Sequence, residues 1–464
     1  MPDNTRKEKD SLGEVEIAGD KLWGAQSQRS LKNFAIGSDR FPAVFIHDFA
    51  LLKKAAAQAN EALGDLAAEQ SGLIQQACDS IMAGNHDEQF PLSVWQTGSG
   101  TQTNMNLNEV IANLGNQAAG AALGSNAPLH PNDHVNRSQS SNDSFPTVMH
   151  ITAMRLSREA LLPALAELIT GLTAKEVEFK DQITSGRTHM MDATPVTLGQ
   201  EFGAFRAQLE FSHQQIEQAL TGVCELAIGG TAVGTGLNSR KQWAATVVDK
   251  INQLSGMSFV PASNKFAQLS AHDALLNLHG QLNLLATALM KIGNDIRLMN
   301  SGPRCGLGEI SLPANEPGSS IMPGKVNPTQ VEALTMVCAR VMGNNSSVSM
   351  AASQGQFQLN VFKPLIIHCL MESLNLLADS MRSFNNNCLS GLTVNEERLK
   401  HYTEQSLMLV TALSPHIGYD NAARAAKHAH EKGLSLREAV LELELLDEAD
   451  YDRLVRPEDM LGPE

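Results

Sequence analysis

The feature that most constrains this chain is a heptad-like apolar spacing, which recurs between about residues 147 and 383. Apolar residues follow one another at alternating steps of three and four, which aligns them along one stripe of an α-helix. The clearest run is unbroken and comprises Leu275, Leu278, Leu282, Leu285, Leu289, Ile292 and Ile296. Shorter runs of the same kind lie within residues 161–172, 202–209, 331–341 and 367–381. Helices striped in this way pack nearly parallel or antiparallel, at about 20°, so the sequence predicts a bundle of about five long helices.

Local signals mark some ends of these helices. Thr197-Leu198-Gly199-Gln200 has the form of a capping box, and Pro364 suits the first turn of its helix. The run 275–296 is apolar beyond a single stripe, because Leu276 and Leu284 add a second face. A helix with two apolar faces has to bury both, either between subunits or inside a thick monomeric core.

The remainder of the chain has a different character. Val15 and Ile17 alternate with polar neighbours as in a short strand, whereas residues 50–63 and 73–81 have helical periodicity. A content of 42% apolar and only 5% aromatic residues also favours helix over sheet. We therefore expect a mainly all-α fold of three domains: an N-terminal domain at 1–139, a central helical-bundle domain at 140–395 and a C-terminal small helical domain at 396–464.

Charge and cysteine content exclude several classes of protein. The formal net charge of −15 argues against binding of nucleic acid or of anionic membrane surfaces. No stretch reaches the roughly 18 uninterrupted apolar residues of a membrane span. Residues 1–14 lack the apolar core of a signal peptide. The six cysteines form no CxxC or Cys/His cluster, as is typical of reduced thiols in a cytoplasmic protein. They are Cys78, Cys224, Cys305, Cys338, Cys369 and Cys388.

Residues 318–330 have the composition of a reactive loop. Gly318 and Gly324 permit backbone angles that are closed to other residues, and two hydroxyls, an ammonium and an amide lie among them. Asn327-Pro328-Thr329-Gln330 predicts a helix start, with Asn327 as N-cap and Pro328 in the first helical position. A hydroxyl-rich loop that leads into a helix N-terminus is a natural seat for a carboxylate. The alternative is an ordinary surface connector.

Two other runs are rich in hydroxyls and amides. Residues 97–106, TGSGTQTNMN, lack the spacing of a P-loop, but neutral donors in such numbers can bind carboxylates. Residues 135–143, VNRSQSSND, precede a long helix. Each run also has a purely structural interpretation, in which it caps the helix that follows. In the second run Asp143 or Ser144 would supply that cap.

His189 lies within residues 185–195, SGRTHMMDATP. A single histidine in a loop is commonly a structural hydrogen-bonding group. Glu332 stands one turn into the helix predicted after the 318–330 loop and would, by itself, be a solvated charge. If the two pair, the carboxylate holds the imidazole in one tautomer and raises its basicity, as a general acid or base requires.

Two apparent motifs carry no cofactor chemistry. His130 and His134 are four residues apart, but Pro131 disrupts the helical geometry that a metal-binding pair needs. Residues 226–236 contain four glycines but lack GxGxxG in a βαβ setting, so a close-packed turn is expected. We predict neither a metal nor a cofactor.

The run GSSIMPGKVNP at residues 318–328 resembles the shared signature loop of the fumarase/aspartase superfamily, whose members add or eliminate HX across a fumarate-type double bond. Gly324 before Lys325 resembles the fumarase form, since aspartases usually carry Ala there. His189 agrees, since aspartases usually carry Gln at that place. With the 97–106 and 135–143 runs, the resemblance covers most of the chain and points to the class II, iron-independent fumarases. It implies a homotetramer whose central helices form one bundle and whose active sites are shared between subunits.

The resemblance also implies roles for individual residues. The catalytic residues would be Ser319, His189, Glu332, Lys325 and Asn327. The substrate-binding residues would be Ser99, Gly100, Thr101, Ser140, Ser141, Asn142, Thr188, Ser320 and Val326. A second dicarboxylate site would comprise His130, Pro131, Asn132 and Asp133. At that second site the match is incomplete, because Asn126, Ala127 and Pro128 stand where the family usually shows basic residues.

The expected reaction is reversible hydration of fumarate to (S)-malate, as in the tricarboxylic acid cycle. Ser319, as alkoxide, would take the proton from the carbon next to a carboxylate. Lys325 and Asn327 would stabilise the resulting dianion, and His189 would protonate or position the departing water on the opposite face. Two alternatives remain: an aspartase-type C–N lyase of the same superfamily, and a non-catalytic helical scaffold.

Overall fold

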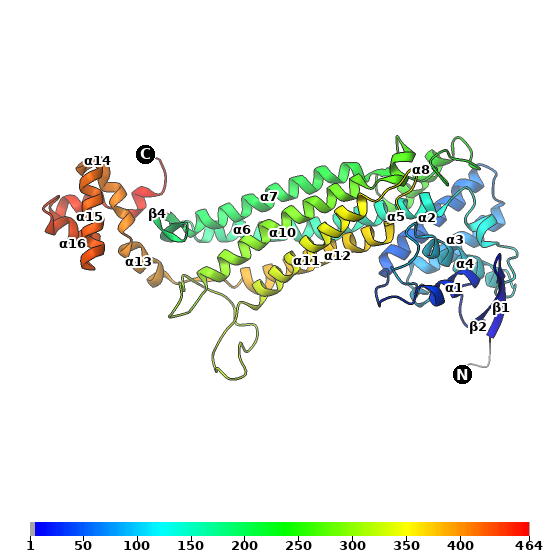
Figure 1. The fold of residues 1–464 in the computed structure, drawn as a ribbon, viewed down its shortest axis with the longest axis horizontal. Coiled ribbons are helices and arrows are strands. Elements are labelled where there is room, and N and C mark those ends of the chain that lie inside the picture. The colour runs from blue at the N-terminus through cyan, green and yellow to red at the C-terminus, as the bar shows by residue number, and fades with distance from the viewer. Residues whose placement is uncertain (1–4, 464) are drawn as a thin grey trace. The chain divides into compact units, whose positions relative to one another are not determined.

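The structure is a computed structural model that describes residues 5–463, and it is mainly helical (Figure 1). Within these residues the strands form four two-stranded sheets. The chain divides into two compact units by its internal contacts. Unit 1 comprises Met1–Leu162, Gln215–Asn283 and Arg340–Leu376, and unit 2 comprises Pro163–Gln214, Leu284–Ala339 and Leu377–Glu464. The three-domain division expected from the sequence stays a prediction.

Long helices follow the apolar spacing of the sequence. They are α6 (Leu162–Glu178), α7 (Leu198–Val223), α10 (Asp273–Met299), α11 (Thr329–Ala352) and α12 (Lys363–Phe384). All seven apolar positions of the 275–296 run are buried in α10. The capping box before α7 is confirmed: the backbone nitrogen of Thr197 and the side-chain oxygen of Gln200 are 3.0 Å apart, as are the backbone nitrogen of Gln200 and the hydroxyl oxygen of Thr197. Pro364 lies in the first turn of α12, as predicted.

Unit 1 is built around α2 (Ala43–Ala62), which packs against α3 (Ala68–Met82), α4 (Thr101–Ala118), α5 (Ser141–Leu156) and α8 (Trp243–Ser255). Phe45 and Phe49 of α2 are fully buried and contact Phe145 of α5, with ring centroids 5.3 and 6.2 Å apart. Helices α1 (Ala25–Asn33) and α9 (Lys265–Ser270) also belong to this unit. Its strands are β1 (Thr5–Asp10), β2 (Gly13–Ala18), β5 (Glu225–Leu226) and β6 (Val260–Pro261). The predicted strand around Val15 is therefore β2, and it pairs antiparallel with β1.

Unit 2 carries a hairpin and a small helical region. Strands β3 (Ile183–Thr188) and β4 (Met191–Thr197) pair antiparallel, and β7 (Ile310–Ser311) pairs with β8 (Thr393–Val394). The helices after residue 395 are α13 (Glu396–Gln405), α14 (Ser414–Ile417), α15 (Tyr419–Lys432), α16 (Leu436–Glu442) and α17 (Glu448–Leu454). Leu413, Leu436 and Val440 form part of their own small core. Helix α13 also packs against β3, which fixes the base of the hairpin.

Candidate active site

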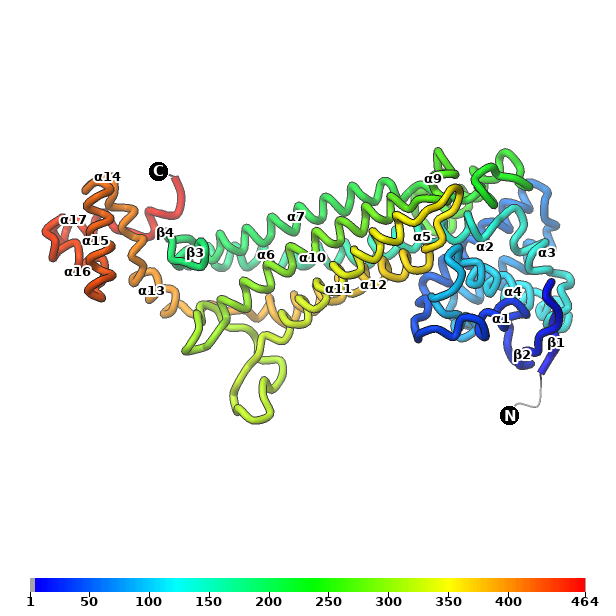
Figure 2. Tube along the Cα trace, in the orientation of Figure 1, coloured from blue at the N-terminus to red at the C-terminus, as the bar shows by residue number. Residues whose placement is uncertain are grey.

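The signature segment lies in a long loop of unit 2 between β7 and α11, and its tube in Figure 2 makes no helical turns. Its ends are joined at the base. Gly318 donates its backbone N–H to the carbonyl oxygen of Lys325 at 2.9 Å, and the Asn327 amide donates to the carbonyl of Gly318 at 2.6 Å. A Cβ at residue 318 would lie 2.1 Å from the Lys325 carbonyl oxygen, so this closure requires glycine.

Ser319 follows directly after that closure. Its hydroxyl oxygen accepts the backbone N–H groups of Met322 at 3.0 Å and of Ile321 at 3.3 Å. Two N–H groups that donate to one oxygen lower the energy of negative charge on it. The loop therefore holds the Ser319 oxygen where its alkoxide form is stabilised.

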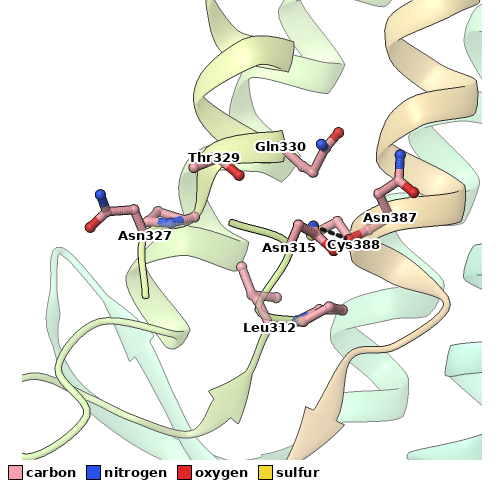
Figure 3. A pocket seen from close by; sticks show the side chains of 9 residues that line it. Leu312, Asn315, Asn327, Thr329, Gln330, Asn387 and Cys388 are labelled. Atoms are coloured by element: carbon pink, nitrogen blue, oxygen red, sulfur yellow. Dashed lines mark hydrogen bonds between the residues drawn. The ribbon is translucent and has the colours of Figure 1, made fainter. Parts of the chain in front are cut away.

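The predicted helix start at Asn327 is wrong in detail. Helix α11 begins at Thr329, and the Asn327 side chain accepts from the Lys325 ammonium at 2.7 Å instead of capping the helix. Figure 3 shows the Asn327 amide pointing away from Gln330 and Asn387. The Gln330 side chain accepts a hydrogen bond from Ser383 and does not reach back to Asn327. Asn327 is therefore committed to the loop closure and to Lys325, because these partners hold both ends of its amide.

Most of the loop tip is open to solvent. Ser320, Lys325 and Val326 are exposed, and the side chain of Ser319 is half-buried. Glu332, in the first turn of α11, is also exposed. The loop thus exposes the Lys325 ammonium and the Ser320 hydroxyl, and the start of α11 exposes the Glu332 carboxylate.

His189 lies at the turn of the β3–β4 hairpin. His189 and Met190 both have left-handed backbone angles, with φ of 56° and 63°, and both side chains are exposed. Thr188, the last residue of β3, is exposed as well. Within residues 5–463 of one chain, no hydrogen bond or ion pair joins His189 to Glu332, so their predicted pairing stays a prediction.

The hairpin is anchored by a buried carboxylate that sequence reasoning did not single out. Glu309 is fully buried, accepts from the Thr184 hydroxyl at 2.7 Å and binds the Arg187 guanidinium at 2.9 and 3.1 Å. Arg187 also lies over the ring of Tyr402 at 5.7 Å. Thr184, Arg187 and Glu309 line a cavity of about 370 Å³ beside the hairpin. Arg187, directly before Thr188, was the sequence signal for such a carboxylate. A guanidinium that is partly buried is commonly paired with a carboxylate.

The 97–106 run lies in unit 1, and half of it is helical. Helix α4 begins at Thr101, so Asn104 and Asn106 are buried helix residues and the loop is shorter than expected. The hydroxyl oxygens of Ser99 and Thr101 are 2.8 Å apart. A Cβ at Gly98 would lie 1.4 Å from the carbonyl oxygen of Val361, and Gly100 has a φ of 77°. The two glycines let this polar turn approach other backbone closely.

The 135–143 run ends in a helix cap. Ser140, and neither Asp143 nor Ser144, is the N-cap of α5, because its hydroxyl accepts the Asn142 N–H at 3.2 Å. Asp143 completes the capping box by accepting the Ser140 N–H at 2.9 Å. The Asn142 amide donates to the Ala232 carbonyl at 2.8 Å. Ser140, Ser141 and Asn142 remain partly exposed, so capping leaves them able to contact a ligand.

Residues 226–236 form the turn that the sequence predicts, and the turn binds Asp143. The carboxylate of Asp143 is fully buried and accepts the N–H groups of Gly229 at 3.0 Å and Thr231 at 2.8 Å. Burial raises the pKa of Asp143 to about 6, while these N–H groups oppose the shift. The glycine-rich turn thus fixes the start of α5 and the polar residues on it.

The predicted second site lies at a short turn, residues 131–135, in unit 1. The His130 imidazole accepts the N–H groups of Asn132 and Asp133, both at 3.2 Å. A neighbouring cavity of about 280 Å³ is lined by His130 and Asn132 together with the charged residues Glu8, Lys9, Asp10 and Glu109. Within residues 5–463, no group of three His, Cys, Asp or Glu side chains is arranged to hold a metal ion.

Comparisons with known proteins identify the family. The family described as "Lyase" matches residues 13–343, and the family described as "Fumarase C C-terminus" matches residues 409–462. The chain is 58% identical to fumarate hydratase class II 1 of Pseudomonas aeruginosa over 98% of both chains. It is 54% identical to fumarate hydratase class II of Helicobacter pylori over 99% of both. The chain belongs to the class II fumarate hydratases.

Solved structures agree with this assignment. The crystal structure of recombinant class II fumarase from Schistosoma mansoni has a TM-score of 0.97 and 46% sequence identity, and the match covers 99% of this chain and all of that chain. The expected superfamily, the mainly helical fold, the hydro-lyase class and fumarate hydration are therefore confirmed. None of the helices between residues 5 and 463 has the length and apolarity that a membrane crossing needs.

Proposed function

We propose that the chain hydrates fumarate reversibly to (S)-malate at active sites shared between the subunits of a cytoplasmic homotetramer. Each site unites three groups of residues. The first is the hydroxyls and the amide of residues 99–101 and 140–142. The second is the hairpin turn at residues 188–189, and the third is the loop and helix start at residues 318–332. His189 and Glu332 are both exposed, and they do not contact each other within one chain. This supports a site that another subunit completes. The tricarboxylic acid cycle is the pathway in which this reaction would serve.

Ser319 is the base in the direction of dehydration. Its alkoxide removes the proton from the malate carbon next to one carboxylate, and the C–H electron pair moves into that carboxylate to give an aci-carboxylate. A serine hydroxyl ordinarily ionises far above neutral pH, and each pKa unit of depression corresponds to about 1.36 kcal/mol. The two N–H groups on the Ser319 oxygen carry this assignment, because they stabilise the alkoxide before substrate arrives.

Lys325 stabilises the charge that develops on the substrate, and Asn327 positions its ammonium. The ammonium of Lys325 is held 2.7 Å from the Asn327 amide oxygen, which keeps it beside the loop. The attraction between this ammonium and the substrate carboxylate is stronger in the transition state than in the ground state, because the carboxylate oxygens gain negative charge as the aci-carboxylate forms. The N-terminus of α11 adds a positive dipole end.

His189 acts on the opposite face of the substrate. The C–O bond breaks with its electron pair on oxygen, and the imidazolium supplies the proton that turns hydroxide into water. Glu332 from a neighbouring subunit then holds the imidazole in one tautomer. The hydroxyls of Ser99, Thr101, Ser140 and Ser141, with the Asn142 amide, bind the substrate carboxylates as neutral donors.

Absorbance of fumarate provides the direct test. Purified chain should consume fumarate and form (S)-malate at the same rate with and without a metal chelator. The Ser319→Ala variant should bind substrate but turn it over orders of magnitude more slowly. Absence of any change in fumarate absorbance with the wild-type chain would refute the proposed function.

A further inference from the structure

Lys53 is a fully buried ammonium on α2 of unit 1, and it has no catalytic role in the mechanism above. It donates to three amide oxygens: Asn104 Oδ1 at 2.7 Å, Asn136 Oδ1 at 3.0 Å and Gln139 Oε1 at 3.0 Å. Within residues 5–463 it forms no ion pair with a carboxylate. Burying a charge is costly unless its hydrogen bonds are satisfied, and here the three donors of the ammonium meet three acceptors.

The ammonium determines which way the amides point. An ammonium only donates, so each amide must turn its oxygen toward Lys53 and its nitrogen away. The Asn136 nitrogen then donates to the carbonyl of Gln139 at 3.2 Å. The Asn104 nitrogen donates to the hydroxyl oxygen of Ser141 at 3.2 Å. Asn136 Oδ1 also accepts from the amide nitrogens of Asn104 and Asn108, both at 3.2 Å, and these bonds agree with the orientation that the cation imposes.

The consequence falls on Ser141. Its oxygen accepts a hydrogen bond from Asn104, so its own proton remains to be donated elsewhere. A carboxylate is an acceptor without a proton to give, and a hydroxyl that must donate is suited to it. If the Asn104 amide were reversed, Ser141 would give its proton to the amide oxygen and would face the substrate with lone pairs.

We propose that Lys53 is a positioning residue, whose buried ammonium orients the Asn104 amide and thereby makes the Ser141 hydroxyl a donor to a substrate carboxylate. The inference rests on the proposed function, in which Ser141 binds fumarate. Lys53 itself does not touch the substrate.

A double-mutant cycle separates this role from general support of the fold. Lys53→Met keeps an apolar stem of similar length but removes the donors. In the wild-type background it should raise the KM for fumarate about tenfold, the usual cost of one charge-assisted hydrogen bond. In a Ser141→Ala background it should raise KM less than about twofold, because the hydroxyl it orients is gone. Equal effects in both backgrounds would overturn the proposal.

The cycle is measured at about pH 6, below the pKa of Lys53, so that the ammonium form predominates. Burial lowers the pKa of Lys53 to about 7, and the nearby carboxylate of Asp143 opposes that shift. Lys175→Met is the matched control, since this buried lysine binds the Glu178 carboxylate and the Leu392 carbonyl, and neither is a candidate site residue. It should lower the melting temperature without changing KM.

Asn104→Asp tests the same idea in a variant that retains Lys53. A carboxylate at residue 104 still accepts from the Lys53 ammonium but loses the N–H that Asn136 Oδ1 accepts at 3.2 Å, so the melting temperature should fall by several degrees while the far-UV circular dichroism spectrum stays that of the folded wild type. A carboxylate has no N–H to give, however, and it accepts the Ser141 proton instead. KM should rise about tenfold, as with Lys53→Met. A KM near the wild-type value would overturn the role of Ser141 as an oriented donor.

The two layers of the proposal fail differently. An inactive wild-type chain would refute the proposed function and, with it, the role of Lys53. An active wild-type chain whose Lys53→Met and Ser141→Ala effects on KM simply multiply would refute only the role of Lys53.

Discussion

The hydroxyl oxygen of Ser319 lies 3.0 Å from the backbone nitrogen of Met322, which donates to it. The bond needs a chain reversal directly after Ser319, and the closure between Gly318 and Lys325 supplies it. If residue 319 served only to accept backbone N–H groups in this turn, Asp or Asn would do so equally well. A hydroxyl in this position gains in acidity, which is the property a serine base requires.

Ser319→Ala should lower kcat at least about a thousandfold, because no other group in the loop replaces the base. The fumarate KM should change much less, since the alanine removes no carboxylate ligand. Initial rates in both directions measure kcat and KM, and circular dichroism checks that the variant is folded. Ser390→Ala is the matched control, because Ser390 is exposed and donates only to a backbone carbonyl of its own turn. Retention of wild-type kcat by Ser319→Ala would exclude the base assignment.

Sharing of active sites between subunits predicts complementation. Ser319→Ala and His189→Asn homotetramers should each be nearly inactive. If Ser319 and His189 of one site come from different subunits, random mixing restores both groups at about a quarter of the sites. Co-refolded mixtures should therefore regain about that fraction of wild-type kcat. Mixtures as inactive as their parents would show that both groups come from one chain.

Gly100 and Gly120 form a matched pair for testing the 99–101 turn. Both have left-handed φ angles, 77° and 79°, but a Cβ at Gly100 would lie 2.1 Å from the Phe145 ring, whereas one at Gly120 meets nothing within 4 Å. Gly120→Ala should cost about 1 kcal/mol of unfolding free energy from backbone strain alone. Gly100→Ala should cost at least about 2 kcal/mol more, because Phe145 is fully buried and cannot yield without repacking. Urea unfolding midpoints test the difference, and equal losses would contradict it.

The apolar spacing predicted the five long helices correctly because burial of a stripe is a local property of a helix. The start of α11 was missed because the Asn327 amide is taken by Gly318, nine residues earlier, through a closure that no local pattern encodes. Glu309 and Arg187 are 122 residues apart in the chain, so their pairing depends on tertiary structure. For Lys53 the only signal was a lysine inside the apolar stretch of α2.

Buried His150 predicts an acid-labile contribution to stability. Its Nδ1 lies 3.0 Å from the Val223 carbonyl oxygen, and burial lowers the pKa of His150 from 6.5 to about 4. Between these values the unfolded chain binds more protons than the folded chain, so stability rises with pH across this window. As pH falls from 6.5 to 4, this group should remove about 3 kcal/mol.

His150→Gln keeps a donor for Val223 and does not titrate. The variant should therefore lose less stability than the wild type on acidification from pH 6.5 to 4. Buried Asp143, whose raised pKa acts with the opposite sign, is present in both proteins and cancels from the comparison. Urea midpoints across this range make the measurement, and parallel curves would contradict the prediction.

The second dicarboxylate site at residues 130–133 also stays a prediction, and its surroundings determine how strong it can be. His130 already accepts two backbone N–H groups, and the adjacent cavity is lined by three carboxylates, Glu8, Asp10 and Glu109, against one ammonium, Lys9. Asn126 and Ala127 supply no cation. A dianion placed there meets carboxylates at short range, where salt screens little. We expect calorimetric titration with a non-reacting dicarboxylate to show a second binding event at least about a hundredfold weaker than the first. The His130→Ala variant should lose this second event and keep its kcat. Two events of similar affinity would contradict this electrostatic argument.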